Sequence, residues 1–98
     1  MRVELAAAAI DDLVEIGAYI ARDNPERAWA FVADIRAHCE RLGKFPYRSP
    51  RRPDLARDVR VNAYRGYLVL YRMVGGVVRI ERVLHAARDL KRIDLDRG

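Results

Sequence analysis

The tripeptide Asp23-Asn24-Pro25 interrupts a long helical pattern and divides it in two. Apolar side chains recur at helical spacing from about residue 9 to 22, and again from about 25 to 42. Asn24 is a favoured N-cap and Pro25 suits the first turn of a helix, whereas the residue before a proline disfavours the helical backbone conformation. The first helix must therefore end before Asn24, and the sequence predicts two helices joined as a tight antiparallel hairpin.

Each predicted helix has one apolar face. In the first helix, the side chains expected to face the core are Ile10, Leu13, Val14, Gly17, Ile20 and Ala21. The acidic residues Asp11, Asp12 and Glu15 lie opposite, with Asp11 and Asp12 expected in the first turn, where negative charge favours the helix dipole. In the second helix, the apolar stripe comprises Ala28, Phe31, Val32, Ile35, Cys39 and Leu42. Gly43 is expected just after the end of the second helix.

The second half of the chain changes to a period of two, which is typical of β-strands. Four strands are predicted, at residues 2–6, 59–63, 67–74 and 77–84. Arg65-Gly66 and Gly75-Gly76 mark turns between the last three, and residues 86–95 form a short last helix or turn. The order is β-αα-βββ-α. This predicts an α+β fold with the helical hairpin packed on a small antiparallel sheet, because neither layer can bury its apolar side alone.

The length and composition restrict the class of protein. A chain of 98 residues has the size of one domain, expected to span residues 1–98. The longest apolar run, Leu5 to Ile10, is far shorter than the ~20 residues that span a bilayer, and no signal peptide follows Met1. Cys39 is the single cysteine, so no internal disulfide and no cysteine-based metal site are expected. We expect a cytoplasmic protein with no metal and no cofactor.

The net charge of +5 is concentrated between residues 41 and 60. This segment holds seven basic and two acidic side chains, and the rest of the chain sums to zero. It also contains Pro46, Pro50 and Pro53, so we expect an irregular surface loop there. A basic segment of this kind favours an anionic partner, either nucleic acid or an acidic protein.

The two histidines, His38 and His85, are candidates for acid–base chemistry. His38 lies on the second helix near its apolar stripe and has no partner histidine or cysteine at metal-ligand spacing, so a structural role is expected. His85 ends the last strand and is followed closely by Asp89, which could orient the ring for general acid–base catalysis. The alternative for His85 is a hydrogen bond that caps the following turn.

Several arginines of the strand region could share one side of the sheet, namely Arg60, Arg65, Arg72, Arg79 and Arg82. They could hold a phosphate or an acidic peptide, or they could pair with Glu81, Asp54 or Asp58. Strand parity places Arg82 with Val78, Ile80 and Leu84, on the expected core face. A charge at that position must be paired unless the strand emerges from the core there.

The chain also resembles a known family. Its opening helices, from Asp12 through Asp23-Asn24-Pro25 to Ile35, are similar to those of the RelE/ParE superfamily of type II toxins. Pro46, Val59-Arg60 and the strand from Tyr67 to Arg72 continue the resemblance in the same order. The string from Arg82 to Leu90 is similar to the RVLHGARD ending frequent in the ParE branch. The resemblance covers residues 3–92 and implies a β-αα-βββ unit with a trailing helix.

The resemblance implies a bacterial toxin neutralised by a cognate ParD-like antitoxin, with inhibition of DNA gyrase as the expected activity. Operator DNA would be reached only through the antitoxin, in a hetero-oligomer, and no membrane would be involved. The alternatives are a RelE-like ribosome-dependent mRNA endonuclease and a non-toxic member that only binds its antitoxin. The nuclease would use Arg60, Arg65, Arg82 and His85. The chain has no tyrosine after Tyr71, which favours a gyrase poison that is not an enzyme over an endoribonuclease.

Two interaction surfaces are expected. The antitoxin is predicted to contact apolar anchors with basic residues at the rim, namely Trp29, Phe45, Tyr47, Arg48, Arg51 and Arg52. The target is predicted to contact the C-terminal segment, through Arg88, Asp89, Leu90 and Arg92. The first expectation rests on the charge of residues 41–60 and on the apolar surface that a small two-layer fold leaves around its helices.

Overall fold

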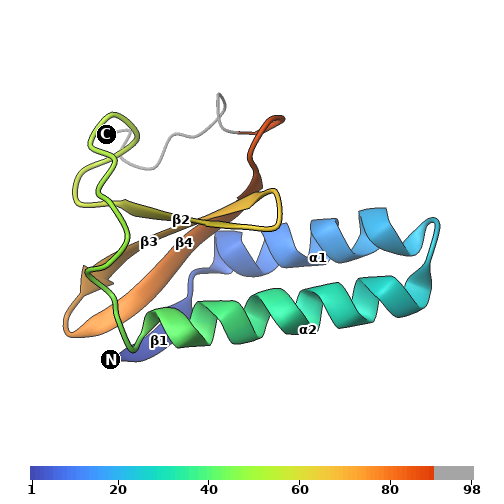
Figure 1. The fold of residues 1–98 in the computed structure, drawn as a ribbon, viewed down its shortest axis with the longest axis horizontal. Helices are drawn as coiled ribbons and strands as arrows, with labels where there is room; N and C mark the ends of the chain where they lie inside the picture. The colour runs from blue at the N-terminus through green and yellow to red at the C-terminus, as the bar shows by residue number, and fades with distance from the viewer. Residues whose placement is uncertain (90–98) are drawn as a thin grey trace.

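The computed structural model describes residues 1–89, which form two helices and a four-stranded sheet (Figure 1). The elements in chain order are β1 (Arg2–Leu5), α1 (Ala7–Ala21), α2 (Pro25–Leu42), β2 (Arg60–Tyr64), β3 (Tyr67–Val74) and β4 (Val77–His85). The predicted α+β architecture is confirmed. The two helices lie side by side on one face of the sheet (Figure 1). Both extend beyond the sheet at the end where α1 connects to α2.

The helical hairpin forms where the sequence predicts it. Asn24 is the N-cap of α2, because its side chain accepts a hydrogen bond of 3.0 Å from the backbone N–H of Arg27, and Pro25 occupies the first turn. The start of α1 differs from the prediction. It begins at Ala7, so its first turn carries no acidic residue, and Asp11 and Asp12 lie one turn further on.

The buried face of α1 also differs from the predicted one. Leu13 is buried as expected, but Ile10 and Val14 are 47% and 66% exposed. Their places in the core are taken by Ala9 and Ile16, together with the acidic Asp12, and the full buried set is Ala9, Asp12, Leu13 and Ile16. The apolar face of α1 is wider than the area that the sheet and α2 bury. The part farthest from the sheet is left open along the seam between the helices.

The sheet has the strand order β1-β4-β3-β2. β2, β3 and β4 form the predicted antiparallel meander, and the turns at Arg65-Gly66 and Gly75-Gly76 all have positive φ, as two-residue hairpins require. β1 pairs with β4 in parallel, so the four-stranded sheet is mixed and not wholly antiparallel. This parallel pairing follows from topology, because α1 and α2 carry the chain from β1 back across the face of the sheet.

A β-bulge shifts the register between β3 and β4. Leu70 pairs with Arg82, whereas the next residue, Tyr71, pairs with Ile80. The extra residue in β4 changes the face of every later side chain. As a result, Ile80 packs in the cluster under the helices, whereas Leu84 packs in a second cluster that contains Leu70. The predicted placement of Arg82 and Leu84 with Val78 and Ile80 on one face is therefore wrong.

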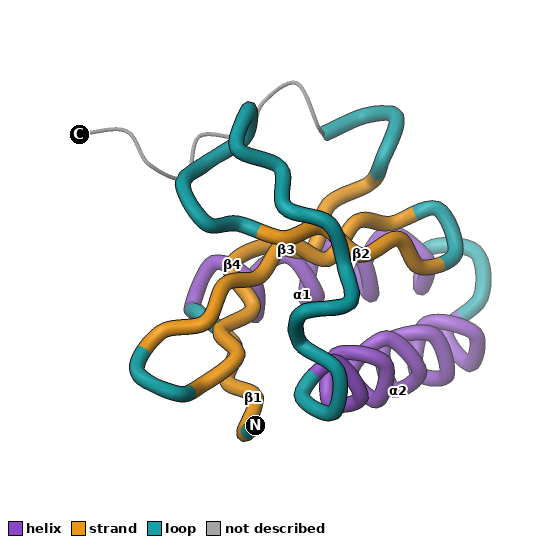
Figure 2. The backbone as a smooth tube through the Cα atoms, turned by 60° about the vertical axis from the view of Figure 1, so that its left-hand side comes forward, coloured by secondary structure: helices purple, strands orange, loops and turns teal. Residues whose placement is uncertain are grey.

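The segment between α2 and β2 covers the second face of the sheet. It leaves the end of α2 and passes to the side of the sheet away from the helices (Figures 1 and 2). Ala56 and Val59 of this segment are buried against side chains of three strands, namely Val61, Leu70 and Leu84. The predicted surface loop is irregular as expected, but it closes a second small core.

The end of α2 and the last segment depart from expectation in different ways. Gly43 has the right-handed helical φ of −65°, so it is not a left-handed terminator. Glycine is needed there because a Cβ would collide with the backbone carbonyl of Met1. Residues 86–89 form a turn after β4. The rest of the predicted last helix, from residue 90 to 95, lies outside the described residues.

Candidate functional site

The first candidate site is built on a joint between α1 and β4. β1 accompanies β4 only as far as Ile80, so the following part of this β4 edge has no neighbouring strand. Asp12 of α1 supplies a hydrogen-bond acceptor to this unpaired part of β4. Its Oδ2 accepts a hydrogen bond of 2.9 Å from the backbone N–H of Val83, and its two oxygens accept from Nε and Nη2 of Arg82 at 2.8 and 2.9 Å. Asp12 is thus buried with both carboxylate oxygens bonded to β4, which confirms that the charge of Arg82 is paired.

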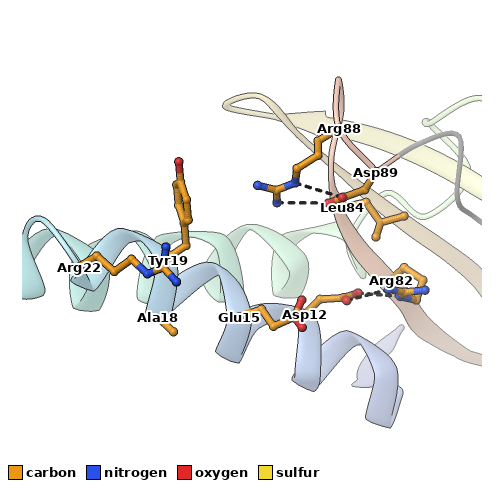
Figure 3. A pocket seen from close by; sticks show the side chains of 9 residues that line it. All are labelled: Asp12, Glu15, Ala18, Tyr19, Arg22, Arg82, Leu84, Arg88 and Asp89. Carbon is orange, nitrogen blue, oxygen red and sulfur yellow. Dashed lines mark hydrogen bonds and ion pairs between the residues drawn. The ribbon is translucent and has the colours of Figure 1, made fainter.

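A cavity of about 550 Å³ lies beside this joint, between α1 and the turn that follows β4 (Figure 3). Its lining residues are Asp12, Glu15, Ala18, Tyr19, Arg22, Arg82, Leu84, Arg88 and Asp89. Arg88 pairs with Asp89 at 3.1 Å across the top, and its guanidinium lies 5.9 Å from the ring centre of Tyr19. The cavity therefore contains two arginine–carboxylate pairs whose charges cancel locally.

The pKa values of these groups move in the direction that keeps the pairs ionised. The hydrogen bond from Arg88 holds the pKa of Asp89 below its ordinary value, and the hydrogen bonds to Asp12 raise the pKa of Arg82. A phosphate that bound Arg82 or Arg88 would have to displace a carboxylate from that arginine. The arrangement is suited to fastening α1 to β4 more than to binding an anion.

His85 caps the turn after β4. Its Nδ1 accepts a hydrogen bond of 3.2 Å from the backbone N–H of Arg88, and the backbone N–H of His85 donates to Asp89 Oδ2 at 3.0 Å. Its ring lies nearly perpendicular to the ring of Tyr67, with centroids 5.5 Å apart. Because Nδ1 accepts here, it carries no proton. This geometry matches the capping alternative expected for His85.

The four residues considered for a ribonuclease do not converge on one point. Arg60 donates to two backbone carbonyls of the preceding loop, at 2.6 and 3.1 Å, whereas Arg65 pairs with Asp34 of α2 at 3.2 Å. Arg60 and Arg65 flank the two ends of β2, roughly 16 Å apart by the rise of a strand. Arg82 is held on α1, and His85 caps its turn. Each arginine is thus held by a different element.

Two other strand arginines are paired as the alternative to a phosphate site predicts. Nε of Arg72 lies 2.7 Å from Glu81, and that carboxylate also contacts Arg79 at 3.2 Å. The Arg72 and Glu81 side chains are 17% and 14% exposed, so this pair is more strongly shielded from solvent than the pair formed by Arg79. These contacts bind β3 to β4 on the face away from the helices.

His38 has a structural environment, as expected for a lone helical histidine. Its Nε2 lies 2.5 Å from Oδ1 of Asn62, and the Asn62 amide donates to Oγ of Ser49 at 3.1 Å. The ring stacks on Tyr64 with centroids 4.2 Å apart. The hydrogen-bonded series joins α2, β2 and the covering segment. Within residues 1–89, no three His, Cys, Asp or Glu side chains are grouped as a metal site would require.

The second candidate site is an apolar groove of about 500 Å³ along the seam between α1 and α2. The side chain of Trp29 stands in it with 82% exposure, next to the exposed Val14 and Ile10. The lining residues are Ile10, Leu13, Val14, Gly17, Ala21, Pro25, Ala28, Trp29, Val32 and Arg36. Sequence reasoning identified Trp29 as an interaction residue but assigned Ile10, Val14 and Gly17 to the core. The sequence signal for the groove was that the apolar residues of α1 span more of the helix surface than one buried face requires.

The structure divides the six residues predicted to contact an antitoxin. Trp29 lies near the start of α2, and Phe45 and Tyr47 follow its end, about 20 Å away by the rise of a helix. Phe45 and Tyr47 are instead on the covering segment, with Arg48, Arg51 and Arg52. Of the residues predicted to contact the target, Arg88 and Asp89 border the first cavity, and Leu90 and Arg92 lie outside the described residues.

Comparison with known proteins identifies the family of the chain. The model of the ParE toxin of the type II toxin–antitoxin system parDE matches residues 3–90. The chain belongs to the ParE toxin family. Among solved structures, it is similar to a chain of the chromosomal ParDE TA system from P. aeruginosa, with 24% sequence identity and a TM-score of 0.75. That alignment covers 87% of this chain and 95% of the other, and it shows that the two share a fold.

The search of curated proteins gave no match to this ParE family member. The described helices include none that is both long enough and apolar enough to cross a membrane. Family membership makes the chain a toxin of a type II toxin–antitoxin system.

Proposed function

We propose that this ParE family toxin acts by binding and poisoning DNA gyrase and that a ParD-like antitoxin neutralises it. The observation that carries the proposal is the family match over residues 3–90, together with the dispersed positions of Arg60, Arg65, Arg82 and His85. Cleavage of RNA needs a proton acceptor, a proton donor and charge stabilisation at one phosphate. A binding poison needs only a complementary surface.

The target-binding surface is proposed to lie at the turn after β4 and in the segment that follows it. Arg88 and Asp89 are held there by each other and by His85, at the rim of the first cavity. Leu90 and Arg92, which follow this turn in the sequence, are proposed to belong to the same target-binding segment. Deleting residues 86–98 is expected to abolish growth arrest while antitoxin binding is at least partly kept.

The antitoxin is proposed to dock an amphipathic helix in the groove between α1 and α2. The groove is elongated along two helices, lined by small and branched apolar side chains, and has an exposed tryptophan as a central anchor. These features suit an apolar helix face, which places anchors at every third or fourth residue. Arg36 at the rim favours an acidic residue beside the apolar face of that helix.

The target is tested with purified toxin in a plasmid supercoiling assay and, in parallel, on translating ribosomes. We expect inhibition of gyrase supercoiling, or trapping of its cleaved DNA complex, while the mRNA stays intact. Cleavage of mRNA on the ribosome, with gyrase unaffected at micromolar toxin, would contradict the proposal. Inactivity in both assays together with tight antitoxin binding would identify a non-toxic member.

The antitoxin groove is tested through the intrinsic fluorescence of Trp29, which is the single tryptophan of the chain. Burial of Trp29 under a helix should shift its emission to shorter wavelength. Val14→Glu places a charge in the groove and should weaken antitoxin binding by more than about tenfold, because an unpaired charge would be buried. Val74→Glu is the matched control, since Val74 is 45% exposed and belongs to the β3–β4 hairpin. Equal binding by both variants would place the antitoxin elsewhere.

A further inference from the structure

Exposed aromatic rings and basic side chains alternate on the segment that follows α2. Phe45 and Tyr47 are 57% and 62% exposed, although rings of this size are usually buried in a small domain. Lys44, Arg48 and Arg51 are exposed beside them. We refer to Lys44, Phe45, Tyr47, Arg48 and Arg51 as the cation–aromatic surface.

The cations of this surface are available to an anion. Arg52, which lies next to it, is neutralised by Asp54 through a two-pronged contact at 2.9 and 2.7 Å. In contrast, within residues 1–89 no carboxylate lies within ion-pair distance of Lys44, Arg48 or Arg51. Most of the net charge of the chain arises in this part of the sequence. The charge that the described residues place at this surface is therefore positive.

Each of the two rings of this surface lies near a guanidinium. The guanidinium of Arg48 lies 4.3 Å from the ring centre of Phe45, and that of Arg60 lies 5.3 Å from the ring centre of Tyr47. A guanidinium stacked on a ring keeps the N–H donors in its own plane, where they can meet phosphate oxygens. The pairing of Phe45 with Arg48 thus offers an apolar face and a phosphate donor side by side.

The backbone that carries the two rings is also held in place by side chains of the sheet. The carbonyl of Pro46, between them, accepts a hydrogen bond of 2.7 Å from the hydroxyl of Tyr71, which is fully buried. Arg60 donates to the carbonyls of Tyr47 and Ser49 and so fixes the next turn of the chain. A surface held in this way loses little conformational entropy when a ligand binds.

We propose that the cation–aromatic surface binds single-stranded nucleic acid. Unpaired bases would stack on Phe45 and Tyr47, and Lys44, Arg48 and Arg51 would contact the phosphates. Stacking platforms combined with basic side chains are the general means of binding a single strand without reading its sequence. An acidic peptide would satisfy the cations but would leave the two rings in water. The surface begins at the end of α2 opposite the α1–α2 connection (Figure 1), so it is separate from the groove proposed for the antitoxin.

The proposal is tested by fluorescence anisotropy with the full-length toxin and labelled 12-nucleotide single-stranded DNA, single-stranded RNA and duplex DNA of the same sequence. We expect both single strands to bind more tightly than the duplex at low salt. Phe45→Leu with Tyr47→Leu should weaken single-strand binding by about tenfold or more, because stacking on each ring contributes about 1–3 kcal/mol. Arg48→Glu with Arg51→Glu should also weaken binding and should flatten the dependence of log K on log salt by about 1.4, the value for two lost phosphate contacts.

The matched control is Arg22→Glu with Arg27→Glu, which makes the same charge change at exposed positions near the α1–α2 connection. Thermal melting of every variant establishes that it is folded. The proposal is overturned if the control weakens binding as much as Arg48→Glu with Arg51→Glu, or if duplex and single strand bind equally. It is also overturned if the toxin binds no oligonucleotide and the Arg48/Arg51 variant loses antitoxin binding, which would assign the surface to an acidic protein. None of these outcomes depends on gyrase inhibition.

Discussion

At the scale of single residues, polar side chains in this toxin mostly hold elements together. Asp12 closes the open part of the β4 edge, and His85 and Asp89 close the turn that follows β4. Among residues 1–89, no buried side-chain nitrogen or oxygen lacks a hydrogen-bond partner. The cost of burying these groups is thus offset locally, and each of them contributes to stability only while its partner is present.

Asp12→Ala should destabilise the fold by about 2–3 kcal/mol, because it leaves Arg82 and the Val83 N–H without their acceptor. The value is set below that of a fully buried pair because the Arg82 side chain is 31% exposed. Urea denaturation measures the change. Asp11→Ala, one residue away and exposed, should stay within about 0.5 kcal/mol of the wild type. Equal effects of the two substitutions would show that the joint contributes nothing.

His85→Ala should reduce stability by about 1 kcal/mol through the lost cap and should leave growth arrest largely intact. His85→Asn should recover most of the stability, since its side-chain oxygen can accept the hydrogen bond from Arg88 in place of Nδ1. Melting temperature and growth arrest are measured together. A stable His85→Asn variant without toxicity would instead support acid–base catalysis, for which a loss of about 10²–10⁴ in rate is expected.

Burial raises the pKa of the Cys39 thiol from its ordinary value of 9.0 to about 11. Below pH 9 the thiol is neutral in both the folded and the unfolded chain. As the pH rises from 9 to 11, the unfolded chain loses this proton first, so stability declines. The stability difference between wild type and Cys39→Ala should therefore shrink by about 1–2 kcal/mol between pH 8 and pH 10.5. A difference that is constant with pH, measured by urea denaturation, would contradict this.

At the scale of elements, the segment between α2 and β2 covers one face of the sheet, as the helices cover the other. It has no regular secondary structure over most of its length, yet Ala56 and Val59 are buried on the sheet and Arg52 and Val61 bond to its backbone. The sheet therefore has both faces covered by different means. On one side lies the helical hairpin, and on the other lies this segment, an anchored strap of 17 residues from 43 to 59.

Val59→Ala tests the strap, because Val59 is fully buried and packs on the face of the sheet away from the helices. Removing two methyl groups should cost about 1.5–2.5 kcal/mol, the transfer free energy plus a cavity term. Val74→Ala removes the same groups from an exposed position and should cost less than about 0.5 kcal/mol. A near-zero effect of Val59→Ala in urea denaturation would mean that the strap is peripheral.

At the scale of the whole molecule, the fold separates an apolar groove from a basic, aromatic surface. The groove lies along α1 and α2, and the cation–aromatic surface follows the end of α2. The two surfaces differ in chemistry, since one offers branched apolar side chains and the other offers exposed rings beside cations that have no carboxylate partner among residues 1–89. A toxin built in this way can keep one surface accessible while the other is occupied.

This separation predicts that substitutions in the two surfaces have independent effects. Val14→Glu should weaken antitoxin binding and leave oligonucleotide binding within about twofold of the wild type, because distant sites are nearly additive. Arg48→Glu with Arg51→Glu should do the reverse at physiological salt. Titration of each variant with antitoxin and with oligonucleotide measures both. Loss of both activities in either variant would show that the two surfaces act as one.

The sequence by itself determined the elements and their order. The Asn24-Pro25 junction and the turn at Gly75-Gly76 are encoded in local backbone preferences, which act before any long-range contact forms. Only the tertiary structure decided which side of an element is buried. The bulge opposite Leu70 changed the face of the later β4 residues, and Asp12 is buried because Arg82, 70 residues later, lies beside it. The open groove has the same origin, since periodicity reveals that a face is apolar but the packing of layers determines how much of that face is covered.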